Sequence, residues 1–461
     1  MRKIIKTIGE AIRGTETDYT TGSINKAILL LSVPMIIEMF GEGLFAIVDA
    51  YFVSQVSNEA FATVILTETV ATIIYSLAIG ISIGAAAMVA RRIGEKDPEA
   101  AGRAAAQSVI LAGGVSLIIS MIGIFFAKDI LLMMGASEAV LEIGVPYTQI
   151  LLGGNIVIML LFILNGIFRG AGDASMAMRS LWIANIINIV LDPLLIFGIG
   201  IFPEMGVVGA AVATTIGRSI GVLFQLYILF KGERVVKLIK GYFKPNYNIL
   251  AKISNVAVTG AGQYIISSAS WIFMMRFISE FGTDAVNGYG LAIRIIIFTI
   301  LPAWGIANAG ATLIGQNLGA NEPERAEKSV WRAAFANAVF LFVISIIYFI
   351  WAEPLLRIFN DDPDVIRIGT EALKIFSLGY IFFGYGMVIN QAFGGAGDTR
   401  TSTFINIVAF WMIQIPLAYV LAQMNNWGPV GVYWAVVISE VCLTLLAIYI
   451  FRKGKWKSVE I

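Results

Sequence analysis

Long apolar runs constrain this chain more than any other feature of its sequence. Hydrophobic residues make up 58% of the chain and charged residues 14%, which is typical of a polytopic helical membrane protein and not of a soluble one. We therefore expect an all-α protein that spans the cell membrane many times. Taking about 20 apolar residues as one crossing, we predict twelve transmembrane helices, six near 26–54, 61–92, 102–127, 143–168, 175–201 and 207–230, and six near 252–281, 286–317, 329–351, 367–392, 401–423 and 429–451.

The loops between these runs alternate in basic charge. Lysine and arginine gather in the N-terminal residues, in every second loop and at the C-terminus, and the intervening short loops have almost none. Under the positive-inside rule, this alternation predicts that both termini are cytoplasmic. Residues 1–24 lack an apolar core with a cleavage site, so we interpret them as a cytoplasmic N-terminal tail rather than a signal peptide. Residues 453–461 are the corresponding C-terminal tail.

The two halves of the sequence repeat. Gly94 with Pro98-Glu99 recurs as Gly319 with Pro323-Glu324, and Phe168-Arg-Gly-Ala-Gly-Asp173 recurs as Phe393-Gly-Gly-Ala-Gly-Asp398, each 225 positions later. An even number of crossings in each copy makes the repeats parallel, related by an axis along the membrane normal. We therefore predict an N-lobe over 25–230, a cytoplasmic linker over 231–250 and a C-lobe over 251–452.

Polar residues in the fifth predicted helix point to a site inside the membrane. Asn185, Asn188 and Asp192 recur at spacings of three and four, which places them on one helix face. An aspartate there costs about 2.5–3.5 kcal/mol on insertion scales, so we expect it to face a protein or water-lined interior. Pro193 has no N–H and leaves the carbonyl of Ile189 without its usual partner. We expect a functional role for Asp192, whereas Asn185 is interpreted as an interhelical hydrogen bonder.

The first predicted helix also carries acids on one face, namely Glu38, Glu42 and Asp49. The predicted orientation brings Asp49 and Asp192 to a similar depth. Buried carboxyl groups can carry protons near neutral pH, and carboxylate and amide oxygens equally suit a hard cation such as Na⁺. The residues alone leave both ions open. The repeat sets Met274 and Ile415 opposite these two acids, so we predict ion coupling in the N-lobe only.

Further residues have predicted roles. Pro34 interrupts the hydrogen-bond ladder of the first helix and is a predicted hinge whose bend responds to protonation near Asp49, although a static kink is equally consistent with the sequence. Arg169 and Arg400 are interpreted as cytoplasmic anchors. The remaining intramembrane polar residues are expected mostly to form interhelical hydrogen bonds: Glu68, Asn155, Asn165, Gln263, Arg294, Asn390, Gln391 and Gln414. Four of the intramembrane polar residues are predicted to bind substrate: Glu42 of the first helix, Asn165, Gln263 and Gln391.

Several classes of protein are disfavoured. The chain has no histidine, which argues against zinc sites and imidazole proton relays, and its one cysteine, Cys442, excludes an intramolecular disulfide. An intramembrane enzyme lacks its nucleophile and base, and the glycine-rich turns lack the Gly-Lys-Ser/Thr ending of a phosphate loop. The formal net charge of +1 argues against nucleic acid as a partner. We expect no enzyme activity and no cofactor beyond a coupling ion.

Four motifs stand out along the chain: the paired Gly-Ala-Gly-Asp turns, Asn188-Ile-Val-Leu-Asp192-Pro193, Gly206-Val-Val-Gly209 and Gln391-Ala-Phe-Gly-Gly-Ala-Gly-Asp-Thr399. Taken together, these motifs resemble the MATE family of multidrug and toxic-compound extrusion transporters, over nearly the whole chain. The resemblance implies a V-shaped pair of six-helix lobes that exports organic cations and amphipathic drugs in exchange for H⁺ or Na⁺ by alternating access. We expect such a transporter to be a monomer in the lipid bilayer.

Within that family, the acids are similar to those of the DinF-like branch. This similarity implies that Asp49, Asn188 and Asp192 are the coupling residues, and the metal ligands if the ion is Na⁺. A threonine of the sixth helix completes the site in relatives. Thr214 is the predicted counterpart, and the neighbouring Thr215 is the alternative.

Two other transporter classes have the same general layout. A lipid-linked oligosaccharide flippase of the same superfamily requires a strongly cationic cavity, whereas the predicted membrane interior here has more acids than bases. A major facilitator transporter has a characteristic basic loop after its second helix, which Gly94-Glu-Lys-Asp-Pro-Glu99 does not match. The flippase is the nearest alternative function.

Overall fold

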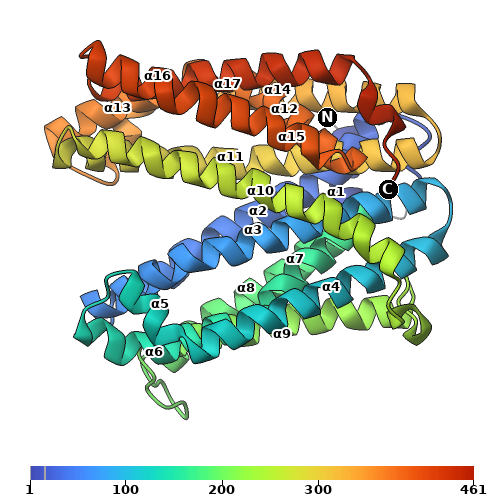
Figure 1. Ribbon diagram of the computed structural model, residues 1–461, viewed down its shortest axis with the longest axis horizontal. Helices are drawn as coiled ribbons and strands as arrows, with labels where there is room; N and C mark the ends of the chain where they lie inside the picture. The colour runs from blue at the N-terminus through green and yellow to red at the C-terminus, as the bar shows by residue number, and fades with distance from the viewer. Residues whose placement is uncertain (1, 15–16) are drawn as a thin grey trace. The chain divides into compact units, whose positions relative to one another are not determined.

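Helices form nearly all of the computed structural model, which describes residues 2–14 and 17–461 (Figure 1). Within these residues there is no β-strand. Residues 1, 15 and 16 of the predicted N-terminal tail lie outside the described part. The first half contains α1 (Arg2–Arg13), α2 (Ile24–Ser54), α3 (Asn58–Gly94), α4 (Pro98–Phe125), α5 (Ala127–Met133), α6 (Glu138–Gly153), α7 (Asn155–Gly170), α8 (Ala174–Ile196) and α9 (Val207–Lys231). The second half contains α10 (Tyr247–Ser279), α11 (Thr283–Gly319), α12 (Pro323–Arg357), α13 (Pro363–Leu378), α14 (Tyr380–Ala396), α15 (Thr399–Asn406), α16 (Ile415–Tyr419) and α17 (Pro429–Arg452).

The all-helical membrane fold predicted from the sequence is confirmed. Over the described residues, ten helical segments are long and apolar enough to cross a membrane, and the bent pair α13–α14 makes an eleventh. The predicted seventh crossing is the 33-residue helix α10, which is not among the segments apolar enough to count. Helices therefore occupy all twelve predicted places, and ten or eleven of them have the composition of a span.

Two of the predicted crossings are broken helices. The fourth is divided into α6 and α7 at Gly154, and the tenth is divided into α13 and α14 at Gly379, where the chain bends by 58°. The two glycines are 225 positions apart, the interval of the repeat. The eleventh crossing has two π-helical segments, η2 (Ile407–Gln414) and η3 (Val420–Met424), on either side of α16. The internal repeat thus extends to the position of a helix break.

Both predicted tails contain ordered structure. The N-terminal tail includes α1, and Arg179 on α8 donates hydrogen bonds to the carbonyls of Ile12 and Arg13 at the end of that helix. The C-terminal tail includes a short 3₁₀ turn, η4 (Lys455–Ser458), and Trp456 within it is 1% exposed. Its ring stacks on that of Phe451 with 4.6 Å between centroids.

The chain packs into two compact units. Unit 1 comprises the described residues up to Thr17, residues Ile37–Ala261, and Ile461; unit 2 comprises Asp18–Ile36 and Gly262–Glu460. Two helices therefore contribute to both units, because α2 changes unit after Ile36 and α10 changes unit after Ala261. These positions are again 225 residues apart. The lobe boundaries proposed from the sequence stay predictions.

Close helix crossings repeat in the two units. In unit 1, a Cβ on Gly80 of α3 would lie 2.4 Å from the carbonyl oxygen of Ala257 on α10. In unit 2, a Cβ on Gly305 of α11 would lie 2.7 Å from the backbone nitrogen of Ile36 on α2. Both distances are too short for a real side chain, so glycine is required for the helices to approach this closely. Gly80 and Gly305 are repeat equivalents, which supports the predicted duplication.

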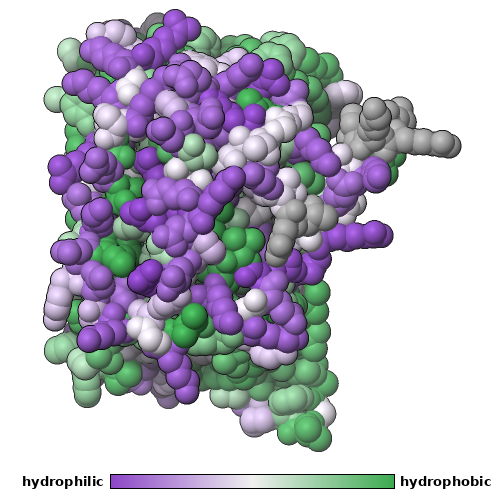
Figure 2. Space-filling model, turned by 90° about the vertical axis from the view of Figure 1, so that its right-hand side faces the viewer, coloured by the Kyte–Doolittle hydropathy of each residue, from purple (hydrophilic) through white to green (hydrophobic). Residues whose placement is uncertain are grey.

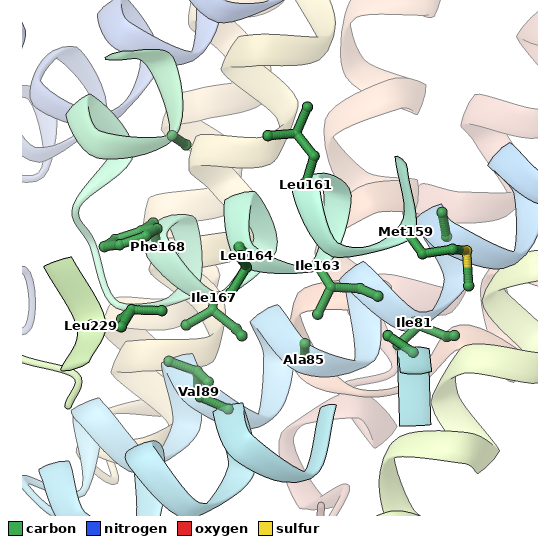
Figure 3. Close-up of a cluster of buried hydrophobic side chains, with 14 of the residues drawn as sticks. Ile81, Ala85, Val89, Met159, Leu161, Ile163, Leu164, Ile167, Phe168 and Leu229 are labelled. Carbon is green, nitrogen blue, oxygen red and sulfur yellow. The ribbon is translucent and has the colours of Figure 1, made fainter. Parts of the chain in front are cut away.

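The core of unit 1 is built between α3 and α7. Figure 3 shows Ala85 and Val89 of α3 facing Ile163 and Ile167 of α7. The backbones approach closely at Gly170, whose added Cβ would lie 2.4 Å from the carbonyl oxygen of Ala86. Small residues at a crossing are the usual means by which membrane helices pack tightly. This closely packed core supports the polar residues of α7 described below.

Large apolar side chains cover the outer flanks of the helices. On α4, for example, Phe125 is 77% exposed and Ile118 is 62% exposed. Figure 2 shows that hydrophilic side chains gather at one end of the helices and that hydrophobic residues appear at its margins. Apolar flanks with polar ends are the surface expected of helices that cross a lipid bilayer.

Candidate functional site

The predicted coupling residues of α8 and α9 meet inside unit 1. Asn188 Nδ2 of α8 donates to Asp192 Oδ1 one turn further along, at 3.1 Å, and to Thr214 Oγ1 of α9, at 3.2 Å. Asp192 is fully buried, and Asn188 is 1% exposed. The helical spacing seen in the sequence therefore does produce a shared polar face. The close approach of α9 at this level is permitted by Gly217, where a Cβ would lie 3.2 Å from that of Asn188.

Two oxygen atoms of this cluster are buried without a hydrogen-bond donor. They are Asp192 Oδ2 and Asn188 Oδ1. Buried polar atoms are almost always paired, because desolvation without a partner is costly. Asp49 of α2 lies in the same unit and is 8% exposed. The cluster thus presents acceptor oxygens and negative charge, which suit a proton or a small hard cation.

The structure distinguishes between the two candidate threonines. Thr214 accepts a hydrogen bond from Asn188, whereas the hydroxyl of Thr215 donates to the Ala211 carbonyl of its own helix, at 2.8 Å. Only Thr214 is therefore part of the cluster. We expect Thr214→Val to destabilise the protein by about 0.5–1.5 kcal/mol, because Asn188 loses a buried acceptor. Thr215→Val is the matched control, and thermal unfolding in detergent compares the two; equal losses would contradict the assignment.

Asn185 and Trp182 attach α8 to α2. Asn185 Nδ2 donates to the Gly41 carbonyl at 2.9 Å, and Trp182 Nε1 donates to the Ile37 carbonyl at 3.1 Å. This confirms the interpretation of Asn185 as an interhelical hydrogen bonder. Because these acceptors lie one turn apart on α2, the two helices are joined along one face of unit 1.

A second buried network surrounds Glu38 of α2, which is 1% exposed. Its Oε1 lies 2.9 Å from Arg169 Nη1 and accepts a hydrogen bond from Asn165 Nδ2 at 3.1 Å. Asn165 Oδ1 in turn accepts from Gln225 Nε2 of α9 at 2.6 Å. The cytoplasmic-anchor interpretation of Arg169 is therefore wrong, because its guanidinium turns inward to pair with a buried carboxylate. Asn165 is an interhelical hydrogen bonder here, and its predicted role in substrate binding stays a prediction.

Arg218 is a buried cation that was not predicted from the sequence. It lies on α9, one helical turn after Thr214, and Arg218 Nη2 is 3.6 Å from Glu42 Oε1. Its guanidinium carbon lies 5.2 Å from the ring centroid of Phe45 and 5.9 Å from that of Tyr75. Glu42, predicted to bind substrate, is thus half-buried in an ion pair. The spacing of four from Thr214 was a signal that could have identified Arg218 as facing the same interior.

The other two predicted substrate-binding residues share a pocket in unit 2. Gln263 of α10 and Gln391 of α14 both line an open cavity of about 300 Å³. This pocket also contains an acid that the sequence analysis did not single out, Glu440 of α17. The repeat equivalents of Asp49 and Asp192 are Met274 and Ile415, so Glu440 is an acid of unit 2 at a different position, and the restriction of ion coupling to the N-lobe stays a prediction.

Pro34 lies inside α2, which continues as one helix from Ile24 to Ser54. It is three residues before Ile37, the first residue of α2 that belongs to unit 1.

Within the described ranges, no group of three or more histidine, cysteine, aspartate or glutamate side chains could hold a metal ion. Any cation at Asp192 would instead be coordinated with the help of amide and hydroxyl oxygens.

The helices and buried carboxylates are those of a polytopic membrane transporter, and comparison with known proteins agrees with this class. The MatE family matches residues 34–194 and 261–420, one match in each half of the chain. The chain therefore belongs to the MatE family, which is a family of transporters and not of enzymes.

Individual relatives match over most of their length. The chain is 28% identical to the probable multidrug resistance protein NorM of Thermotoga maritima, over 94% of this chain and 93% of that protein. It is 26% identical to the multidrug export protein MepA of Staphylococcus aureus, over 94% of each chain. Among solved structures, one match is the outward-facing conformation of a multidrug resistance MATE family transporter of the MOP superfamily. The two structures superpose with a TM-score of 0.89 at 27% identity, and the match covers 96% of this chain and 100% of that chain.

Proposed function

We propose that this protein is a secondary active multidrug exporter that exchanges organic cations and amphipathic drugs for H⁺ or Na⁺. The coupling ion binds in unit 1 at Asp49, Asn188, Asp192 and Thr214. The observation that carries this proposal is the pair of buried acceptor oxygens on Asn188 and Asp192 that have no donor. Similarity to proteins named for multidrug resistance and multidrug export supports the substrate class. Placing the coupling site in unit 1 corresponds to the DinF-like branch.

Ion binding alters the electrostatics of unit 1. Asp49 and Asp192 repel each other when both are ionised, and a proton or Na⁺ between them removes that repulsion. An ion that binds one conformation better than another shifts the population toward it. The acceptor oxygens of Asn188 and Asp192 are held in place by the packing of α8 on α9. We therefore propose that α2 is the helix that changes position when the ion binds. This is the step that links the ion gradient to alternating access.

Pro34 is the proposed hinge of that response. It lies on the same helix as Asp49, and α8 holds the intervening part of α2 through the carbonyls of Ile37 and Gly41. Proline leaves one carbonyl of the ladder without its donor, so bending there is easier than elsewhere in α2. Distances between spin labels on either side of Pro34 should differ between low and high pH. Identical distances at both would leave Pro34 as a static kink.

The alternative of a lipid-linked oligosaccharide flippase is less well supported. A pyrophosphate requires unneutralised positive charge, but Arg169 and Arg218 each have a carboxylate partner in unit 1.

We further propose that the protein acts as a monomer in the cell membrane with both termini in the cytoplasm, and that it needs no cofactor besides the coupling ion.

Efflux from proteoliposomes tests the proposal. Vesicles containing the purified protein are loaded with a fluorescent organic cation, and a pH gradient and a Na⁺ gradient are imposed separately. We expect one gradient to drive efflux against the dye gradient. Protein-free vesicles control for leak. Failure of both gradients to drive any of several cations would reject cation export.

A further inference from the structure

The pocket of unit 2 has aromatic walls. It is bounded by α10, α11, α14, α15, η2 and α17. The rings of Tyr264 and Trp304 lie 5.5 Å apart at 32°, and Trp271, Phe383 and Phe410 complete the aromatic lining. Such an environment favours a ligand with flat aromatic rings that are weakly hydrated. The faces of the tryptophan indole rings also attract cations. The cavity of about 300 Å³ is of the size that accepts a small drug-like molecule.

The amide side chains of this pocket form hydrogen bonds with one another or with polar residues just behind the lining. Gln263 Oε1 accepts from Ser402 Oγ at 2.8 Å, and Asn390 Nδ2 donates to Asn406 Oδ1 at 3.0 Å. Gln391 Nε2 donates to Asn308 Oδ1 at 3.3 Å. These amides fix the shape of the wall and contribute no net charge. Asn390 Oδ1 is a further buried acceptor without a donor.

Glu440 is the charged residue of the lining. The other lining side chains are neutral amides, hydroxyls, aromatic rings and aliphatic groups. Across residues 2–14 and 17–461, no lysine or arginine forms a salt bridge with Glu440. A carboxylate without a cationic partner, set in an aromatic wall, matches a ligand that brings one positive charge.

We propose that this pocket binds an aromatic organic cation carrying a single positive charge, and that Glu440 supplies its countercharge. The inference rests on the proposed export of organic cations and specifies which pocket receives them and how charge is selected. A monocation is neutralised by Glu440 while its rings pack on Trp304 and Trp271. A dication of the same ring system would leave its second charge desolvated without a partner, which is strongly unfavourable.

Ethidium and propidium are suitable probes, because they share a phenanthridinium ring system and carry one and two positive charges. Binding to the purified full chain in detergent is measured by fluorescence anisotropy in alkaline buffer, with no ion gradient. We compare the parent with Glu440→Gln, which removes the charge and keeps the shape, and with Glu440→Asp, which keeps the charge. Glu371→Gln is the control, because Glu371 is an exposed acid of α13 in the same unit and does not line the pocket.

We expect ethidium to bind the parent saturably and Glu440→Gln to raise its Kd by about tenfold or more, equivalent to about 1.4 kcal/mol. Glu440→Asp should stay within about threefold of the parent, and Glu371→Gln should match it. Propidium should bind the parent at least about tenfold more weakly than ethidium. An unchanged Kd in Glu440→Gln, equal affinity for the two dyes, or no saturable ethidium binding would overturn the proposal.

Binding and transport separate the two proposals. Normal ethidium efflux with no effect of Glu440→Gln on affinity rejects the role of Glu440 and retains cation export. Glu440-dependent binding with no gradient-driven efflux rejects export and retains the site. An unchanged size-exclusion profile and melting temperature in Glu440→Gln establish that any loss of binding is not a loss of fold.

Discussion

Replacing Asp192 with asparagine is expected to abolish gradient-driven efflux. The substitution keeps the size of the side chain and an acceptor for the Asn188 amide, which lies 3.1 Å from Asp192 Oδ1. It removes the negative charge that a proton or Na⁺ would neutralise, and it puts the amide NH2, a donor, where Oδ2 now lies without a donor. Uphill transport without coupling is thermodynamically excluded, so the expected loss is complete rather than partial.

Asp49→Asn should have the same effect in the same assay, because the two carboxylates act on one ion. Asp129→Asn is the matched control: Asp129 is an exposed acid on α5 of the same unit and lies outside the cluster. Downhill leak of dye through the variants distinguishes lost coupling from lost folding. Retention of uphill efflux by both variants would show that these acids do not couple transport.

The second large effect concerns the ion pair between Glu38 and Arg169. Arg169→Met is expected to destabilise the protein by about 3–5 kcal/mol, because it leaves a buried carboxylate without its cation. Glu38 is 1% exposed, so its carboxylate is shielded from solvent and depends on the guanidinium for its charge partner. The double variant Glu38→Gln with Arg169→Met should recover most of this loss, since glutamine still accepts from Asn165. Thermal unfolding of the parent, both single variants and the double variant measures the coupling.

An exposed ion pair provides the comparison. Arg357 and Glu353 lie 2.8 Å apart at the end of α12, and each side chain is 55% exposed. We expect Arg357→Met to change stability by about 0–1 kcal/mol, as is usual for surface pairs. A similar small change in Arg169→Met would mean that Glu38 finds another partner or is neutral in the folded protein.

Much of the fold followed from the sequence because lipid imposes simple rules. Backbone groups must be satisfied within each span, so long apolar runs can only be helices. The breaks at Gly154 and Gly379 were not predicted, because a glycine inside an apolar run is also compatible with a continuous helix. The helix predicted over 252–281 overlaps most of α10, which begins five residues earlier and ends two residues earlier, and its composition is more polar than that of the other spans.

The site was predicted in part. Helical spacing was sufficient to put Asn188 beside Asp192, since both lie on one helix. The choice of Thr214 over Thr215 required the packing of α9 on α8, which periodicity does not determine. The pairing of Glu38 with Arg169 joins residues 131 positions apart, and Arg169 was interpreted from its loop position alone. Glu440 was not predicted, because it is not the repeat equivalent of Asp49 or Asp192.

The most direct test of coupling in unit 1 is ion movement driven by substrate. Proteoliposomes with no initial ion gradient receive an inward or outward gradient of an organic cation, and internal pH and radiolabelled Na⁺ are followed. The account predicts that one ion moves opposite to the substrate in the parent and that neither moves in Asp49→Asn or Asp192→Asn. Substrate-driven ion movement that persists in both variants would contradict it.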